Sequence, residues 1–206
     1  MVSHKTRHRS HRRRSPIDWG VRLTLAAGAA WLGFGAVSHS VAYMTRGSAV
    51  NQAHELAPDD GRITALLAQK LAGPNASPAD RERSDYLAKQ ALRQDATAVA
   101  AVATLGINAQ IRGETSRARR IFAYSRLLSR RDLRTGLWSI EDAVGRGNID
   151  QALRNYDITL KTSRAASDLL FPVLSGAIDN AAIRDGLVPI LATRPLWGAN
   201  WITMPR

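Results

Sequence analysis

Apolar residues recur at intervals of three and four along most of this chain, and clusters of Gly, Pro and Asp separate the periodic segments. That interval is the period of one face of an α-helix. No segment shows the strict alternation or the density of Val, Ile and Thr that is typical of β-strands. The pattern therefore predicts an all-α fold. One helix is expected to end near 57, and others to span 62–72, 80–94, 97–111, 115–129, 133–144, 150–162, 167–179 and 181–193.

The segment 23–44 is apolar almost throughout rather than periodic, and it reads LTLAAGAAWLGFGAVSHSVAYM. As a helix it would be roughly 33 Å long at about 1.5 Å per residue, and the hydrocarbon core of a bilayer is about 30 Å thick. A basic flank of this strength is not expected beside a buried helix of a soluble domain. We therefore predict a transmembrane signal-anchor helix over 21–45, which contacts the lipid bilayer through residues 23–44.

Positive charge is concentrated before this span. The chain carries a formal net charge of +12, of which +7 belongs to residues 1–46 and +5 to residues 47–206. We predict that residues 1–20 form a disordered basic leader in the cytoplasm, whose cations are attracted to anionic lipid headgroups. A basic arm can also bind the phosphates of a nucleic acid. Because the headgroups account for the same residues without a further partner, the sequence does not favour nucleic-acid binding.

The orientation of the span follows from the excess of positive charge before it, which the positive-inside rule keeps in the cytoplasm. We therefore expect a single-pass inner-membrane protein in which the chain after residue 45 lies in the periplasm. Two alternatives stay open. Ser40-Val41-Ala42 has the small residues of a cleavage site, and cleavage near Ala42 would release a soluble exported protein. Residues 1–17 are Arg-rich and lack acids, as mitochondrial presequences do, so the mitochondrial inner membrane is the other alternative.

Two stretches of the periodic region repeat each other. RGETSRARRIFAYSRLL begins at position 112 and RGNIDQALRNYDITLKT at position 146, so that Ala118 matches Ala152 and Phe122 matches Tyr156 at an offset of 34 residues. A small residue lets a neighbouring helix come close, and an aromatic ring four residues later fills the space beside it. The repeat predicts helical hairpins whose apolar faces cover one another.

A 34-residue helix–turn–helix unit with these positions resembles the tetratricopeptide repeat. Ser139-Ile140 stands where the family has Leu-Gly, and arginine occupies the place of its closing proline at 130 and 164. The resemblance is fair over 99–166 and loose over 47–98 and 167–193. It implies an α-solenoid of antiparallel helical hairpins over residues 46–194. The matching residues are Leu105, Gly106, Gly113, Ala118, Phe122, Gly147, Ala152 and Tyr156.

Members of this family usually bind peptides or partner domains in a groove lined by the first helix of each hairpin. The set of Lys and Asn with which some members hold a C-terminal carboxylate is missing here. The resemblance implies a scaffold for protein–protein interactions. Together with the predicted span, it leads us to expect a membrane-anchored scaffold in cell-envelope assembly or export. Packing against neighbouring helices is the alternative role for the same positions. The groove residues implied by the resemblance are Ala100, Ala103, Ile107, Arg134, Leu137 and Glu141.

Arginine is dense over residues 112–134, where the net charge is +6. Arg119, Arg126 and Arg130 are spaced to lie along one flank of the helix predicted there. Arginine forks suit carboxylates, phosphates and acidic polysaccharides. We therefore predict a patch for an acidic partner or for anionic headgroups, with a merely solvated face as the alternative. In a cleaved and exported protein the ligand would be an acidic peptide or polysaccharide.

Catalytic chemistry finds little support in the sequence. The chain has no Cys, and none of its five His lies beyond residue 54. A phosphate-cradling Gly-rich loop, an H-E-x-x-H motif and a G-x-S-x-G motif are also missing from it. We expect no enzyme activity, no cofactor, and no catalytic or metal site.

Residues 195–206 are predicted to form an irregular tail. The tail holds Trp197 and Trp201 after Pro195, and it lacks the polar capping helix that usually closes a helical array. Three explanations stay open. A partner covers the last hairpin, the natural relatives are longer, or the tryptophans fold back over the helix predicted at 181–193.

Overall fold

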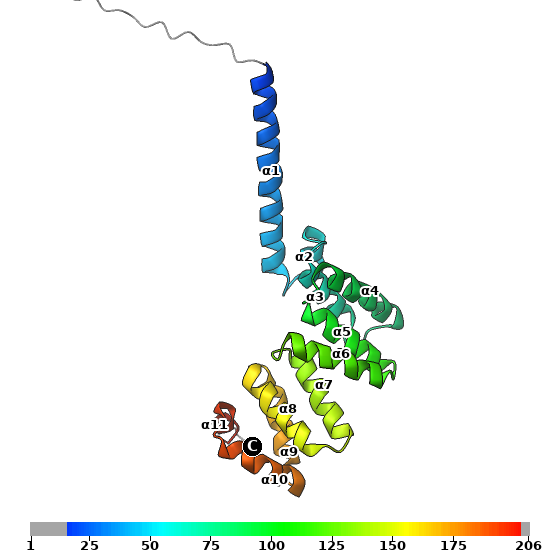
Figure 1. The fold of residues 1–206 in the computed structure, drawn as a ribbon, viewed down its shortest axis with the longest axis vertical. Helices are drawn as coiled ribbons and strands as arrows, with labels where there is room; N and C mark the ends of the chain where they lie inside the picture. The colour runs from blue at the N-terminus through cyan, green and yellow to red at the C-terminus, as the bar shows by residue number, and fades with distance from the viewer. Residues whose placement is uncertain (1–15, 203–206) are drawn as a thin grey trace, which may run out of the picture.

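The computed structural model describes residues 16–202, and all regular structure in that range is helical. This confirms the all-α class. Figure 1 shows α1 as a rod that projects from one end of the body, with α2–α5 nearest to it and α9–α11 at the far end. Residues 1–15 of the predicted leader and the last four residues lie outside the described range, whereas residues 16–20, which were predicted to be disordered, form the start of α1. The helices are α1 (Pro16–Thr45), α2 (Val50–Leu56), α3 (Gly61–Leu71), α4 (Pro78–Gln94), α5 (Val99–Ile111), α6 (Thr115–Leu128), α7 (Leu133–Gly145), α8 (Ile149–Thr162), α9 (Ala166–Ala177), α10 (Ala181–Ala192) and α11 (Leu196–Ile202).

Polar side chains fix several helix starts. The Asp60 carboxylate accepts hydrogen bonds from the first backbone N–H groups of α3. Ser77 and Asp80 form a reciprocal capping box at the start of α4. Asp132 caps α7 and Asn148 caps α8 through their side-chain oxygens. Such caps satisfy donors that the helix itself leaves unpaired. The boundaries predicted for the helices of the body therefore agree with the structure to within about two residues.

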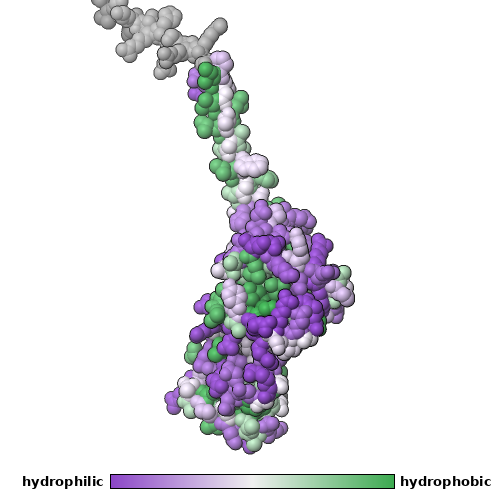
Figure 2. All heavy atoms as spheres, turned by 45° about the vertical axis from the view of Figure 1, so that its right-hand side comes forward, coloured by the Kyte–Doolittle hydropathy of each residue, from purple (hydrophilic) through white to green (hydrophobic). Residues whose placement is uncertain are grey.

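The helix α1 is long and apolar enough to cross a membrane. Figure 2 shows hydrophobic residues along most of its length, whereas the body is mostly hydrophilic on this face. No residue in its most apolar stretch is buried against the body. The end of the helix does reach the body, because Ala42 is fully buried together with Ala53, Ala57 and Ile63. Packing at that point, as well as the chain itself, therefore joins α1 to the body.

Helices that follow one another in sequence pack as pairs, α3 with α4, α5 with α6, and α7 with α8. The turns of the last two pairs are built alike. Gly113 (φ +78°) and Gly147 (φ +68°) adopt the left-handed conformation, which glycine enters without strain. In the first turn, the backbone N–H of Glu114 donates to the carbonyl of Ala109. In the second, the backbone N–H of Asn148 donates to the carbonyl of Ala143. The 34-residue repeat of the sequence is therefore a repeat of backbone hydrogen bonds.

The residues that carry the resemblance lie where the helices of a pair meet and where they turn. Ala118 and Phe122 are fully buried. A Cβ atom on Gly106 would lie 2.8 Å from the Phe122 ring, so the absence of a side chain on α5 leaves room for that ring. The other matched residues are the nearly buried Ala152 and Tyr156, the half-buried Leu105, and the exposed turn glycines Gly113 and Gly147.

Buried apolar residues form separate groups along the body. One group lies across α3, α4 and α5, and a second joins α5 to α6 around Phe122. A third group begins at α7 and extends to Trp197 in α11. The second and third groups meet where α6 faces α7, and there the rings of Phe122 and Trp138 stack with centroids 4.3 Å apart. We call this junction the α6–α7 seam.

The end of the chain differs from the prediction of an irregular tail, because Leu196–Ile202 form a short helix, α11. Trp197 is only 5% exposed, and its indole donates a hydrogen bond to Asp157 of α8. The indole of Trp201 donates to Ser175 of α9. Each indole has an apolar body to bury and an N–H to satisfy, and α8 and α9 offer both. The tryptophans therefore hold the tail against the body.

Candidate functional site

An apolar pocket of about 620 Å³ lies between α7, α8 and α9, and we call it the α7–α9 pocket. α7 contributes Leu137 and Glu141, two of the residues that were expected to line a partner groove. The opposite wall comes from α9, through Leu169 and Val173. α9 packs mainly on α8, which leaves the space between α7 and α9 open.

The lining of the α7–α9 pocket is suited to apolar groups. Glu141 is the one carboxylate among its lining residues. Tyr156 also lines the pocket, and burial raises the pKa of its phenol. Val144, Leu169 and Val173 line it as well, although each is at least half exposed to solvent. Exposed apolar side chains gathered beside a pocket are typical of a surface that another molecule covers.

Other predicted groove residues do not line this pocket. Ala103 has no exposed surface and packs with Ala118 and Phe122, so its prediction as a groove residue is wrong. Ala100 and Ile107 are half-buried and pack against the core groups of α3–α6. The helix α5 is apolar on nearly every side, and its pattern alone therefore does not separate a core face from an open face.

Arg134, the remaining predicted groove residue, is half-buried in the first turn of α7. Burial lowers the pKa of its guanidinium, and the nearby charge of Asp132 opposes this effect. Its Nη1 atom is buried without a hydrogen-bond partner among the described residues. This nitrogen is therefore a donor that no described residue uses.

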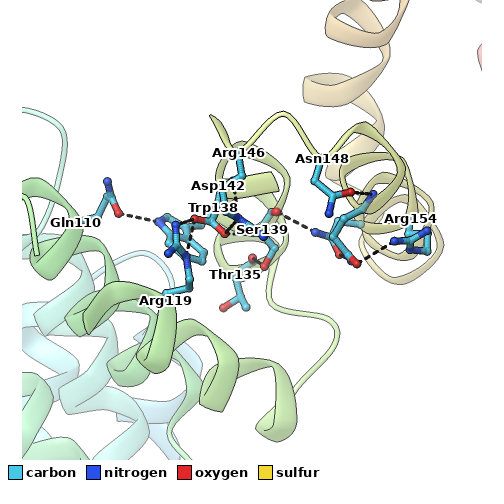
Figure 3. Close-up of polar contacts among 11 residues, drawn as sticks. Gln110, Arg119, Thr135, Trp138, Ser139, Asp142, Arg146, Asn148 and Arg154 are labelled. Carbon is cyan, nitrogen blue, oxygen red and sulfur yellow. Dashed lines mark hydrogen bonds and ion pairs between the residues drawn. The ribbon is translucent and has the colours of Figure 1, made fainter. Parts of the chain in front are cut away.

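Arg119 forms an ion pair within the protein instead of joining Arg126 and Arg130 in an open patch. Its guanidinium lies 2.7 Å from one oxygen of the Asp142 carboxylate across the α6–α7 seam, and Arg146 lies 3.1 Å from the other (Figure 3). The hydrogen bond that Arg119 donates raises the pKa of its guanidinium. Beside it, the indole of Trp138 donates to Gln110 of α5 at 3.3 Å. The expectation that Arg119 faces an external anion is therefore corrected: its partner is Asp142.

Arg126 and Arg130 are placed differently. Both line a second cleft of about 380 Å³ between α6, α7 and α8, which we call the arginine cleft. Both residues are exposed, and neither side chain forms an ion pair with another residue of the range 16–202. Two of the three predicted arginines thus share one cleft, and the third does not.

The described part of the chain shows no cluster of metal-ligating side chains. Among residues 16–202, no group of three or more His, Asp or Glu side chains is placed to hold a metal ion. The expectation that the protein is not an enzyme stays a prediction. The surfaces that the structure does offer are suited to binding.

No family model, curated protein or solved structure matches this chain. The likeness to the tetratricopeptide repeat therefore remains a resemblance that the chain's own residues carry. The sequence analysis did not predict that α9 lines the pocket or that Trp138 packs in the α6–α7 seam. The apolar density of 166–177 was a visible signal, but periodicity does not specify the angle at which one helix pair follows another.

Proposed function

We propose that this protein is a membrane-anchored scaffold built from tetratricopeptide-like helical hairpins, and that its α7–α9 pocket receives an apolar segment of a protein partner. The observation that carries this proposal is the α7–α9 pocket itself, with its apolar lining and the exposed Leu169 and Val173 on one wall. The repeated turns at Gly113 and Gly147 support the solenoid part of the proposal.

An amphipathic helix is the partner segment that fits the pocket best. Such a helix places apolar side chains three and four residues apart on one face, and a groove between two helices accepts that face. A pocket of about 620 Å³ has room for several such side chains. The single carboxylate of Glu141 beside it suits a basic residue on the flank of the bound helix.

The anchor and its orientation belong to the same proposal. The charge of the segment before α1 places the N-terminus in the cytoplasm by the positive-inside rule, and the body then lies on the far side of the inner membrane. The packing of Ala42 with Ala53 and Ile63 favours an anchor that is kept. Cleavage there would separate α1 from the body with which it packs. Retention of the protein in membranes after alkaline carbonate extraction, together with an intact N-terminal mass, is the expected result.

Quantitative affinity purification from native membranes tests the binding part of the proposal. The change Val173→Asp places a charge in the pocket, and Val188→Asp places one on α10 outside it. Val173 and Val188 are 58% and 62% exposed, so neither change buries a charge. We expect the Val173→Asp variant to lose one or a few co-purified proteins that the Val188→Asp variant retains. Equal recovery of every co-purified protein with both variants would contradict the proposal.

A further inference from the structure

We propose that the arginine cleft is an anion-binding site for the carboxylates of an acidic peptide segment, held by the guanidinium groups of Arg126 and Arg130. This site is independent of the partner proposed for the α7–α9 pocket, because the two use different residues of α7 and α8.

Pairing separates these two arginines from Arg112, Arg117 and Arg119, and their position in the cleft separates them from Arg120 and Arg131, which form no ion pair within the described residues either. Arg112 and Arg117 both pair with Glu114, and Arg119 pairs with Asp142. Arg126 and Arg130 form no ion pair within the described residues, although they belong to the same arginine-rich stretch. An arginine that lies beside a cleft with its donors unused is free to bind a carboxylate through its planar fork.

Several other polar groups of the cleft already form internal hydrogen bonds. Asp132 also lines it, but its carboxylate caps α7 by accepting from the backbone N–H and the hydroxyl of Thr135. The hydroxyl of Thr159 donates to the carbonyl of Asn155, and the amide of Asn155 donates to the carbonyl of Ser139. The two guanidinium groups are therefore the cationic donors that the cleft offers to a ligand.

The loop that carries Arg130 is held in place. The backbone N–H of Arg131 donates to the hydroxyl of Ser129. The hydroxyl of Thr162 lies 2.9 Å from the carbonyl oxygen of Arg130 and 2.8 Å from that of Ile158, so these two acceptors share its one proton. The contact of Thr162 with Arg130 ties the loop to the end of α8. A backbone fixed on both sides reduces the ordering that binding would otherwise require.

Two features favour a peptide over lipid headgroups. Figure 1 shows that α2–α5 lie between α1 and the region of α6 and α7, so the cleft is away from the end of the body that adjoins the anchor. The cleft is also lined by apolar residues, among them Leu127, which is 84% exposed, and Ile158. A peptide offers both carboxylates and apolar side chains to such a lining, whereas a headgroup offers only the charge.

The test uses the full chain in nanodiscs of neutral phosphatidylcholine and a fluorescent peptide in which Glu and Ala alternate. We expect Arg126→Gln/Arg130→Gln to weaken binding by at least about tenfold, since each lost charged hydrogen bond costs on the order of a tenfold change in affinity. The control is Arg120→Gln/Arg131→Gln, which removes the same charge from two exposed arginines outside the cleft. We expect the control to weaken binding by less than about threefold, through long-range charge alone.

Further arms identify the source of the anion. Inorganic phosphate is the competitor for simple anion binding, and vesicles containing phosphatidylglycerol are the probe for headgroups. The result expected is binding of the peptide by the wild type, retained by the control, with no vesicle binding that depends on Arg126 and Arg130. Equal losses in the two double variants, no binding of the peptide by the wild type, or capture of the vesicles but not the peptide would each overturn the proposal.

Discussion

At the scale of single residues, the contact between a glycine and a ring explains why the first repeat copy packs so closely. Gly106 on α5 faces the fully buried ring of Phe122 on α6, and a Cβ atom would meet that ring at 2.8 Å. The second copy has Ile140 in the place of Gly106 and Tyr156 in the place of Phe122. The small residue is therefore a requirement of the α5–α6 pair and not of the repeat in general.

This contact predicts the sign of a small change. Gly106→Ala gains about 1 kcal/mol of helix propensity but overpacks the core, which costs about 1–3 kcal/mol, so we expect a net loss of stability. The control is Gly176→Ala in α9, where no atom lies within 4 Å of the added Cβ and only the gain applies. Urea unfolding followed by circular dichroism compares the two variants with the wild type. A Gly106→Ala variant more stable than the wild type would show that the ring has room to move.

Two misplaced residues show where sequence reasoning reaches its limit at this scale. The pattern placed Ala118 and Phe122 on one helix face, and both are buried. It did not separate Ala103 from the groove, because α5 is apolar on nearly every side. It also left Arg119 unpaired, because its partner Asp142 is 23 residues away and becomes a neighbour only after α6 and α7 have packed.

At the scale of helices, capping residues set the boundaries and local signals identify them well. An exception is α6, which has no side-chain cap. Glu114 occupies its cap position without a capping hydrogen bond, because its carboxylate pairs with Arg112 and Arg117. The helix α11 was missed for a different reason. The hydrogen bonds of its tryptophans to Asp157 and Ser175 come from helices earlier in the chain, and no local pattern contains them.

The link between α4 and α5 predicts a dependence of stability on pH. The hydrogen bonds from the hydroxyl and backbone N–H of Thr97 lower the pKa of Asp95, and Arg62 contributes to the same effect. A carboxyl whose pKa is lower in the folded state stabilises the fold above its ordinary pKa of 3.8, and this contribution is lost as the pH falls through the folded value.

We therefore expect the difference in unfolding midpoint between the wild type and Asp95→Asn to reach its largest value at pH 5 and above. It should shrink as the pH falls below about 3.8. Asp59→Asn, which removes an exposed carboxylate from the turn between α2 and α3, is the matched control. Midpoints measured by urea titration at a series of pH values provide the comparison. A difference for Asp95→Asn that stays constant across this range would contradict a stabilising role for the hydrogen bonds that the carboxylate accepts from Thr97.

At the scale of the whole molecule, the described residues divide into the long helix α1 and a body with two parts. The helix α1 exposes its apolar surface along most of its length, as a membrane span does, and only its end packs with the body. Within the body, the α6–α7 seam joins two separate groups of buried residues through the stacked rings of Phe122 and Trp138 and the ion pair of Arg119 with Asp142. Both proposed binding surfaces involve α7 and α8, the pair that follows the seam.

The central claim is that the α7–α9 pocket holds a protein partner while α1 holds the chain in the membrane. Photocrosslinking in native membranes tests it most directly, with a photoreactive amino acid placed at Val173 in the pocket or at the equally exposed Val188 outside it. We expect a discrete protein adduct from Val173 that disappears when Leu169→Asp is added, and no such adduct from Val188. Equal crosslinking from both positions, or adducts from Val173 to lipid alone, would contradict it.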